Sequence, residues 1–281
     1  MSIQFSAIIP TFNRANWLEK AILSVLEQSV APLELIVVDD GSTDDTKKLV
    51  SKFDKVKYIY QNQKGPSAAR NTGAKVAQGT HLAFLDSDDQ WDPNKLKKQK
   101  EYLLKNPHLK CVYTNEIWIR NGKRINLHKH HYKIGGWIYL DCLLLCRISP
   151  SSIVISKELF IDLGGFDESL IIAEDYDLWL RLSAVEEIGY CDQHLIQKFG
   201  GHEDQLSRRW GMDNNRVYSL EKILNSKQLK EEYLLPTIDN LVSRLEVLII
   251  GYQKHNKNVE ANDFINKLDF WKNRKLRLNE E

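Results

Sequence analysis

The residues best suited to chemistry lie at positions 86–89, where the chain reads Asp86-Ser87-Asp88-Asp89 directly after the apolar run 81–85. Three carboxylates this close repel one another. A hard divalent cation would compensate that repulsion, because Mg²⁺ and Mn²⁺ favour carboxylate oxygen ligands. Mg²⁺ is usually held by one or two carboxylates together with substrate phosphates. The pattern therefore predicts a metal site that also receives a phosphate-bearing substrate. The alternative is an Asp-rich turn that leads into the helix expected from Pro93.

A second acidic segment, residues 37–44, reads Val-Val-Asp-Asp-Gly-Ser-Thr-Asp. A carboxylate such as Asp39, at the end of a strand, can accept a hydrogen bond from a ribose hydroxyl or a base N–H, and Gly41 permits a tight turn. The alternative is a helix start capped by Ser42 or Thr43. The sequence contains neither G-x-G-x-x-G nor G-x-x-x-x-G-K-[ST], so dinucleotide and P-loop sites lack their phosphate loops.

Two further segments add polar groups. Residues 65–71 combine small side chains, a helix start and Arg70, which suits close approach to a nucleotide. Glu174 and Asp175 follow a glycine turn at 164–165 and begin a predicted helix, where one of them could act as a general base. Acids in a first helical turn are also favoured by the helix dipole alone. His202 is open to the same two interpretations, as a ligand or as a structural residue.

These side chains need a scaffold, and the first hundred residues alternate strand and helix patterns. Strands are predicted at 5–10, 34–40, 58–61 and 81–85, and helices at 16–28, 43–53, 67–77 and 93–106. Such alternation indicates a parallel sheet with helices on both faces, in which ligands bind at the carboxyl ends of the strands. Asp39 and Asp86 both fall at such ends.

The rest of the chain is more mixed. Strands are predicted at 110–120 and 151–156, with a hairpin turn at 121–122 and a helix at 174–187. From about residue 212 the composition is helical, which divides the chain into residues 1–210 and a helical extension, 211–281. Residues 128–133 hold three His and two Lys, and they either contact an anionic acceptor or form a solvated loop.

The bulk composition excludes several classes of protein. The formal net charge of the 281 residues is +1, so we expect no nucleic-acid partner. The four cysteines contain no C-x-x-C pair, which fits a reducing compartment, and Cys142 and Cys146 are expected on one helix face. The chain shows no signal-peptide pattern and no apolar run near the ~20 residues that span a bilayer. We expect a soluble, cytoplasmic protein. The basic, amphipathic segment 264–278 either contacts the inner face of a membrane or packs on the body.

Taken together, these segments resemble the family 2 glycosyltransferases of GT-A fold. The matching pieces follow the family's order over residues 3–210: 8–14, 38–44, 68–73, 85–89, 164–167 and 174–175. The resemblance implies an α/β fold with a Rossmann-like, mostly parallel sheet flanked by helices, followed by a C-terminal helical extension. It also implies an inverting, metal-dependent hexosyltransferase of polysaccharide biosynthesis. The donor would be a nucleoside-diphosphate sugar, with UDP as the default, and the acceptor a cell-surface glycan or a lipid-linked saccharide.

The same resemblance implies roles for individual residues. Asp39 would contact the base, and Asp86 the ribose or a metal-bound water. Asp88 would bind Mn²⁺ or Mg²⁺ bridging the diphosphate, with Asp89 as its substitute, and His202 would reach the metal or the diphosphate. Asp175 would be the general base, with Glu174 beside it. The nucleotide-sugar pocket would be lined by Pro10, Thr11, Phe12, Arg14, Asp39, Arg70, Asp86, Ser87 and Asp88.

Two other functions compete with this one. A nucleotidyltransferase that makes nucleotide sugars would share the alternating architecture and the metal, but the chain lacks a glycine-rich, lysine-bearing phosphate loop near its N-terminus. A non-catalytic nucleotide-sugar-binding protein would not need the candidate catalytic acids, all of which are present. The sequence therefore favours the transferase.

Overall fold

The computed structural model describes residues 2–125, 132–201, 211–226 and 229–280. The strands are β1 (Phe5–Thr11), β2 (Glu34–Asp39), β3 (Val56–Tyr60), β4 (His81–Phe84), β5 (Gln90–Trp91), β6 (Cys111–Arg120), β7 (Lys123–Ile125), β8 (Val154–Ser156) and β9 (Gly189–Gly200). The helices are α1 (Ala15–Leu26), α2 (Thr46–Val50), α3 (Pro66–Val76), α4 (Lys95–Lys105), α5 (Tyr139–Leu144), the 3₁₀ turn η2 (Pro150–Ser152), α6 (Lys157–Asp162), α7 (Glu174–Val185), α8 (Met212–Asn225), α9 (Glu231–Lys254) and α10 (Asn258–Glu280).

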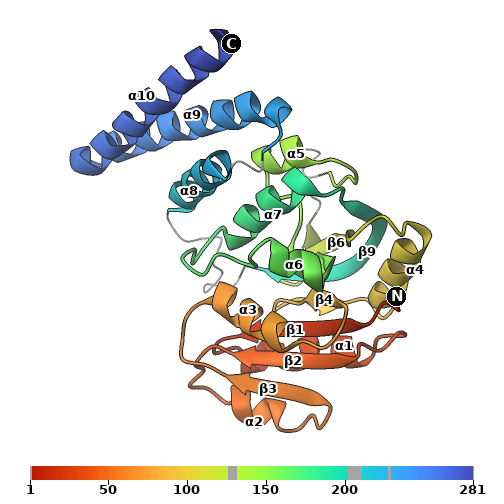
Figure 1. The fold of residues 1–281 in the computed structure, drawn as a ribbon. Coiled ribbons are helices and arrows are strands. Elements are labelled where there is room, and N and C mark those ends of the chain that lie inside the picture. Colours follow the sequence, from red (N-terminus) through yellow and green to blue (C-terminus); the bar gives the residue numbers. More distant parts are fainter. Residues whose placement is uncertain (1, 126–131, 202–210, 227–228, 281) are drawn as a thin grey trace.

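One nine-stranded mixed sheet forms the centre of the fold (Figure 1). Its order is β3-β2-β1-β4-β8-β6-β9-β5, and β7 pairs with β6. Strands β3, β2, β1 and β4 are parallel, as the alternating sequence predicts. Beyond β4 the pairs β4–β8, β8–β6 and β9–β5 are antiparallel, and β6–β9 is parallel.

Helices cover both faces of the sheet because the central strands are apolar on both sides. Ala7 and Ile9 of β1 belong to the hydrophobic cluster that includes α1, α2 and α4. Ile8, between them, belongs to the cluster that includes α3, α5, α6 and α7. All seven residues of β1 are buried, which is typical of a parallel strand between two helical layers.

Two local predictions are wrong. The helix expected to be capped by Ser42 or Thr43 begins at Thr46, because the Asp44 carboxylate accepts hydrogen bonds from the backbone N–H and the hydroxyl of that residue. Helix α5 ends at Leu144, so Cys142 and Cys146 do not share a helix face. The histidine-rich residues 128–131 lie outside the described part of the chain.

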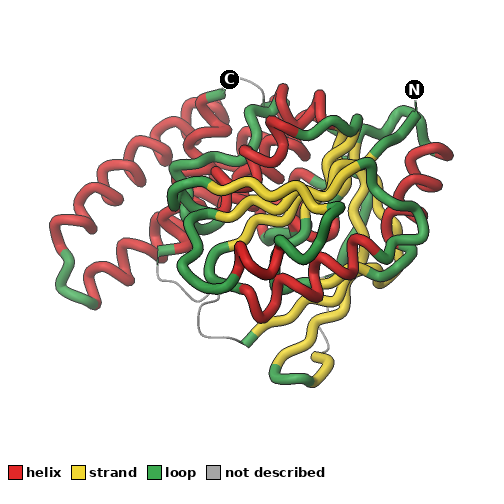
Figure 2. The backbone as a smooth tube through the Cα atoms, turned by 90° about the horizontal axis from the view of Figure 1, so that it is seen from below, coloured by secondary structure: helices red, strands yellow, loops and turns green. Residues whose placement is uncertain are grey.

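The C-terminal helices share the core of the α/β part. Val217 of α8, Leu241 of α9 and Trp271 of α10 lie in the same hydrophobic cluster as Ile8 and Phe84. Helices α9 and α10 form an antiparallel pair that projects from the body, which Figures 1 and 2 show from two directions.

Two lysines of α10 pair with acids of the neighbouring helix α9. Lys272 and Lys275 pair with Glu246 and Asp239 of α9 at 2.8 and 2.6 Å. Together with the buried Trp271, these contacts favour packing of segment 264–278 on the body, and membrane contact stays a prediction. Among the helices of the described residues, none combines the length and apolar character that crossing a membrane requires.

Candidate active site

The sequence motifs meet at one edge of the sheet, where β1, β2 and β4 end. Thr11 and Asp39 are register partners at the ends of β1 and β2, and Asp86 follows β4. The N-terminus of α7 joins this edge through Glu174, as described below. Parallel strands bring their carboxyl ends to the same edge, so residues far apart in sequence become neighbours there.

Asn13 fastens the loop after β1 to the loop after β2. Its backbone N–H donates to the Ser42 hydroxyl and its side-chain oxygen accepts from Thr43 N–H, both at 2.8 Å. Asn13 has a left-handed backbone (φ 52°), a conformation that Asn tolerates better than most residues. Asp39 is buried and accepts from Ser42 N–H at 2.8 Å and from the Tyr58 hydroxyl at 2.6 Å. The base-binding candidate is therefore held in one orientation.

The loop after β1 carries the other nucleotide-pocket candidates. Thr11 is buried, and within the described residues its hydroxyl has no hydrogen-bond partner. Phe12 is 38% exposed and can offer its ring to a flat ligand. Pro10 is buried in β1. Arg14 pairs with Asp88 at 2.5 Å. A water or a ligand group can supply the partner of this buried hydroxyl.

Arg70 joins the acidic loop to α7. Its guanidinium donates to Asp86 at 2.7 Å and to Glu174 at 2.8 Å. Burial alone lowers the pKa of Arg70, but the two carboxylates outweigh it and raise that pKa above its ordinary value, so the side chain stays charged. Burial raises the pKa of Glu174, Arg70 opposes this and Asp175 adds to it, with a net upward shift.

Asp89 has a structural role. It is buried and accepts from the Ser151 hydroxyl at 2.7 Å and from Phe199 N–H at 3.2 Å, and Lys198 lies 3.4 Å away. Burial raises the pKa of Asp89, and Lys198 opposes the shift. These contacts tie the acidic loop to η2 and β9.

The three acids are compensated by the protein itself. Asp86, Asp88 and Asp89 have Arg70, Arg14 and Lys198 as their respective partners. Each carboxylate of the loop therefore has a basic partner in the protein, and a bound cation stays a prediction. No three His, Cys, Asp or Glu side chains group as a metal site in the described ranges, and His202 lies outside them. Ser87, which follows Asp86, is buried. Asp88 differs from the other two acids of the loop, because Asp89 is buried and Asp86 is paired with Arg70.

The two acids at the start of α7 point to different partners. Glu174 pairs with Arg70, whereas Asp175 accepts a hydrogen bond from the thiol of Cys146 at 3.2 Å. Burial and the adjacent Asp175 raise the pKa of Cys146 well above its usual value, so the thiol stays protonated and can donate. Ala173, just before them, has a left-handed backbone (φ 60°), a strained conformation for a residue with a Cβ.

The glycine turn before α7 holds Arg70 in place. Gly164 and Gly165 have φ values of +82° and +68°. The Asn71 side chain hydrogen-bonds to the residue after the turn: its NH₂ group donates to the Phe166 carbonyl at 2.8 Å, and its oxygen accepts from Phe166 N–H at 3.0 Å. The Arg70 guanidinium carbon lies 5.1 Å from the centre of the Phe166 ring. Residues 68–73 and 164–167, which both resemble family motifs, therefore contact each other through Asn71, Arg70 and Phe166.

Sequence patterns do not identify Cys146, Ser151 or Lys198 as contacts of the candidate acids. Lys198 lies on β9, whose polar run Asp192–His194 hides the strand pattern. Cys146 is 29 residues from Asp175, and no spacing rule connects them. No local signal identifies any of the three, because each becomes relevant only through packing.

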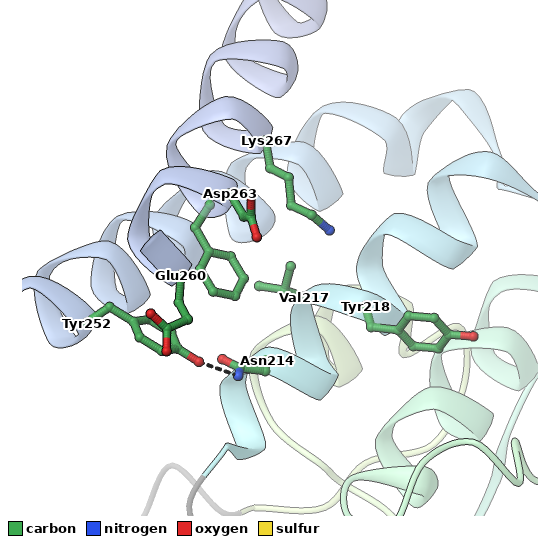
Figure 3. Close-up of a pocket in the computed structure, with 8 residues that line it drawn as sticks. Asn214, Val217, Tyr218, Tyr252, Glu260, Asp263 and Lys267 are labelled. Carbon is green, nitrogen blue, oxygen red and sulfur yellow. Dashed lines mark hydrogen bonds between the residues drawn. The ribbon is translucent and has the colours of Figure 1, made fainter. Parts of the chain in front are cut away.

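A separate pocket of about 360 Å³ lies between α8, α9 and α10 (Figure 3). Asn214 and Tyr252 are hydrogen-bonded in its wall at 2.7 Å. Its lining comprises Asn214, Val217, Tyr218, Tyr252, Glu260, Asp263, Phe264 and Lys267. None of these belongs to the site predicted from the sequence.

Comparison with known proteins identifies the family. The profile of glycosyl transferase family 2 matches residues 6–162. A Rickettsia felis protein named an uncharacterized glycosyltransferase is 31% identical over 92% of this chain, which spans 44% of that relative's length. The Escherichia coli enzyme WfgD, named a UDP-Glc:alpha-D-GlcNAc-diphosphoundecaprenol beta-1,3-glucosyltransferase, is 36% identical, over 89% of this chain and 94% of its own. The crystal structure of S. aureus TarS with UDP-GlcNAc superposes with a TM-score of 0.69 and 19% identity, over 97% of this chain and 93% of that one, so the two share a fold. The chain therefore belongs to glycosyl transferase family 2.

Proposed function

We propose that this glycosyltransferase moves a sugar from a UDP-sugar to a lipid-linked saccharide or another glycan, with inversion at the anomeric carbon. The observation that carries the proposal is the Arg70 bridge, which joins the acidic loop at Asp86 to Glu174, the neighbour of the candidate base. The names of two relatives support the substrate classes. TarS was crystallised with UDP and UDP-GlcNAc, and WfgD is named for a UDP-Glc donor and a diphosphoundecaprenol-linked acceptor.

The donor's nucleoside would lie at the ends of β1 and β2. Asp39 keeps acceptor capacity for a base N–H, since each carboxylate oxygen has two lone pairs and each accepts one bond here. The orphan hydroxyl of Thr11 and the exposed ring of Phe12 supply a polar and an apolar contact at the same edge. Arg14 would face the diphosphate beside Asp88.

The site fits a divalent metal held in part by substrate. Asp88 offers one carboxylate, and Mg²⁺ and Mn²⁺ accept one or two carboxylates together with diphosphate oxygens. A bound metal would stabilise, as a Lewis acid, the negative charge on the leaving diphosphate. Asp88 is the proposed ligand, with His202 as the proposed second one, and Arg14 is the cation that competes for Asp88.

Asp175 is the proposed general base. It would take the proton of the acceptor hydroxyl while that oxygen bonds to the anomeric carbon and the bond to the diphosphate breaks. Each oxygen of Asp175 accepts one hydrogen bond, Oδ2 from the Cys146 thiol and Oδ1 from the backbone N–H of Tyr176. A carboxylate oxygen has two lone pairs, so one on either oxygen remains for the acceptor hydroxyl. Glu174, held by Arg70, would position the start of α7.

Calorimetric titration of UDP, GDP and dTDP, with and without Mn²⁺, tests the donor site. We expect UDP to bind, and Asp88→Ala to lose the metal-dependent part of the affinity. The exposed Asp263→Asn is a control that should bind UDP unchanged. Absence of binding for all three nucleotides would contradict the donor assignment.

Transfer assays with Asp175→Asn test the base. We expect sugar transfer to be abolished while UDP affinity stays within a factor of two or so, because the residue acts only in the chemical step. Parallel loss of affinity and activity would refute the assignment. Pyrophosphate release from a nucleoside triphosphate would favour the nucleotidyltransferase instead. UDP-sugar binding with neither transfer nor hydrolysis would favour a binding protein.

A further inference from the structure

Two arginines from the C-terminal helices share one carboxylate near the proposed base. Arg244 of α9 and Arg216 of α8 approach the same oxygen of Asp213 at 3.0 and 3.4 Å. Asp213 is itself 41% exposed, so water screens its charge. Two guanidinium groups with one half-solvated carboxylate between them leave a net positive cluster.

The cluster lies next to the residues that hold Asp175. The guanidinium carbons of Arg216 and Arg244 are 5.6 and 5.9 Å from the ring centre of Tyr176, which follows Asp175 in α7. Arg244 also approaches the carbonyl oxygen of Leu144 at 3.5 Å, just before Cys146, whose thiol donates to Asp175. The two arginines therefore contact the residue after Asp175 and the segment before Cys146, whereas Arg70 contacts Glu174.

Arg216 has donor capacity that the protein does not use, whereas the nitrogens of Arg244 donate to Asn240, Asp213 and the carbonyls at 143–144. Within the described residues, the buried Nε of Arg216 has no acceptor. Guanidinium groups bind phosphate through paired N–H donors. The cluster thus matches an anion with several oxygens.

Exposed apolar side chains border the cluster. Leu140 and Leu144 lie one turn apart on α5 and are 47% and 61% exposed. Val247 follows Arg244 by three residues on α9 and is 60% exposed. Phosphate-binding cations beside exposed aliphatic side chains suit an amphiphile. A small water-soluble phosphate would make no use of the aliphatic side chains.

We propose that Arg216 and Arg244 bind the diphosphate of a lipid-linked acceptor. Its hydrocarbon chain would extend along the exposed side chains of Leu140, Leu144 and Val247. The inference rests on the proposed function and extends it, because it names the group by which the acceptor is recognised. The acceptor's diphosphate would be held on the α8–α9 side while its sugar hydroxyl meets Asp175.

Calorimetry on the full chain with saturating UDP tests the assignment, since UDP then fills the donor's own diphosphate site. The probe is dodecyl diphosphate below its micelle concentration, compared with methyl diphosphate. We expect the dodecyl compound to bind, and Arg216→Gln and Arg244→Gln each to weaken it about tenfold to a hundredfold, the usual range for a hydrogen bond to a charged group. Arg277→Gln, an exposed change on α10, is the matched control and should have no effect.

The outcomes separate the inference from the proposed function. Equal probe affinity in wild type and both Gln variants, with UDP bound, would overturn the arginine assignment and leave the donor site intact. Equal affinity for methyl and dodecyl diphosphate would overturn the lipid part. If UDP does not bind, titration of the same variants with dodecyl diphosphate alone still tests the assignment of Arg216 and Arg244. If a Gln variant fails to fold, Arg216→Lys keeps the charge and should weaken the probe less than tenfold.

Discussion

Removal of Arg70 should destabilise the protein strongly, and the size of the effect should depend on pH. Arg70→Met keeps the apolar packing on Phe166 but leaves Asp86 and Glu174 without their partner. Breaking a buried ion pair by removing one member typically costs about 3–5 kcal/mol, because a buried charge is left uncompensated. The Asp86 side chain is 23% exposed and can be rehydrated, whereas that of Glu174 is 9% exposed. We therefore expect Arg70→Met to lower the free energy of unfolding by about 3–4 kcal/mol at pH 8, mostly because the Glu174 carboxylate loses its partner.

The pH dependence follows from Glu174. Burial raises the pKa of Glu174 in the folded protein, and Arg70 opposes that rise, so its removal raises this pKa further. A carboxyl group with a raised folded pKa stabilises the fold below its unfolded pKa of 4.5 and loses that contribution as pH rises through the folded pKa. The cost of Arg70→Met should therefore shrink to about 1–2 kcal/mol near pH 4.5, where the orphaned carboxyl is protonated.

Urea unfolding followed by tryptophan fluorescence, at pH 8 and pH 4.5, measures both quantities. Adding Glu174→Gln to Arg70→Met removes the orphaned charge and should recover about half of the loss at pH 8. Arg124→Met, an exposed change on β7, is the control and should stay within about 0.5 kcal/mol of wild type. A loss for Arg70→Met below about 1 kcal/mol, or an equal loss at both pH values, would refute the reasoning.

Two further changes test the packing around the site. Lys95 is fully buried, its Nζ lies 3.9 Å from the ring centre of Trp91 with no hydrogen-bond partner in the described ranges, and burial lowers its pKa well below 10.5. Lys95→Met should raise the free energy of unfolding at pH 7 by about 1–3 kcal/mol. The gain should fade toward pH 10, because the folded wild type binds fewer protons than its unfolded chain and gains stability as pH rises; a gain that is constant with pH would contradict this. A Cβ on Gly73 would lie 2.5 Å from Cγ2 of Ile8, so Gly73→Ala should cost about 1–3 kcal/mol in urea unfolding. The control is Gly251→Ala in α9, where a Cβ meets no atom within 4 Å, so the free energy of unfolding should stay the same or rise by up to about 1 kcal/mol. An equal loss of stability in the two variants would argue against the close approach of α3 to β1.

Local sequence pattern determined the framework and the position of the acids. The apolar runs before Asp39 and Asp86 are typical of strands buried on both faces, and the acids follow directly after them. Alternating helices make these strands parallel, which brings their ends, and therefore the acids, to one edge. The order of the family motifs, and the place of Asp39 and Asp86 at the carboxyl ends of strands, could be read from the sequence for this reason.

Tertiary structure alone decided what each acid does. Asp88 and Asp89 are adjacent in sequence, yet one is paired with Arg14 and the other is buried against Ser151 and Lys198. Periodicity reports which face of an element is buried, but an ion pair depends on which side chains meet after distant elements pack. The short polar interruption in β9 hid the strand that carries Lys198, and nothing local marks Cys146 as the partner of a residue in α7. Secondary structure follows from neighbours along the chain, whereas the ion pairs and hydrogen bonds of this site follow from contacts between residues far apart in the sequence.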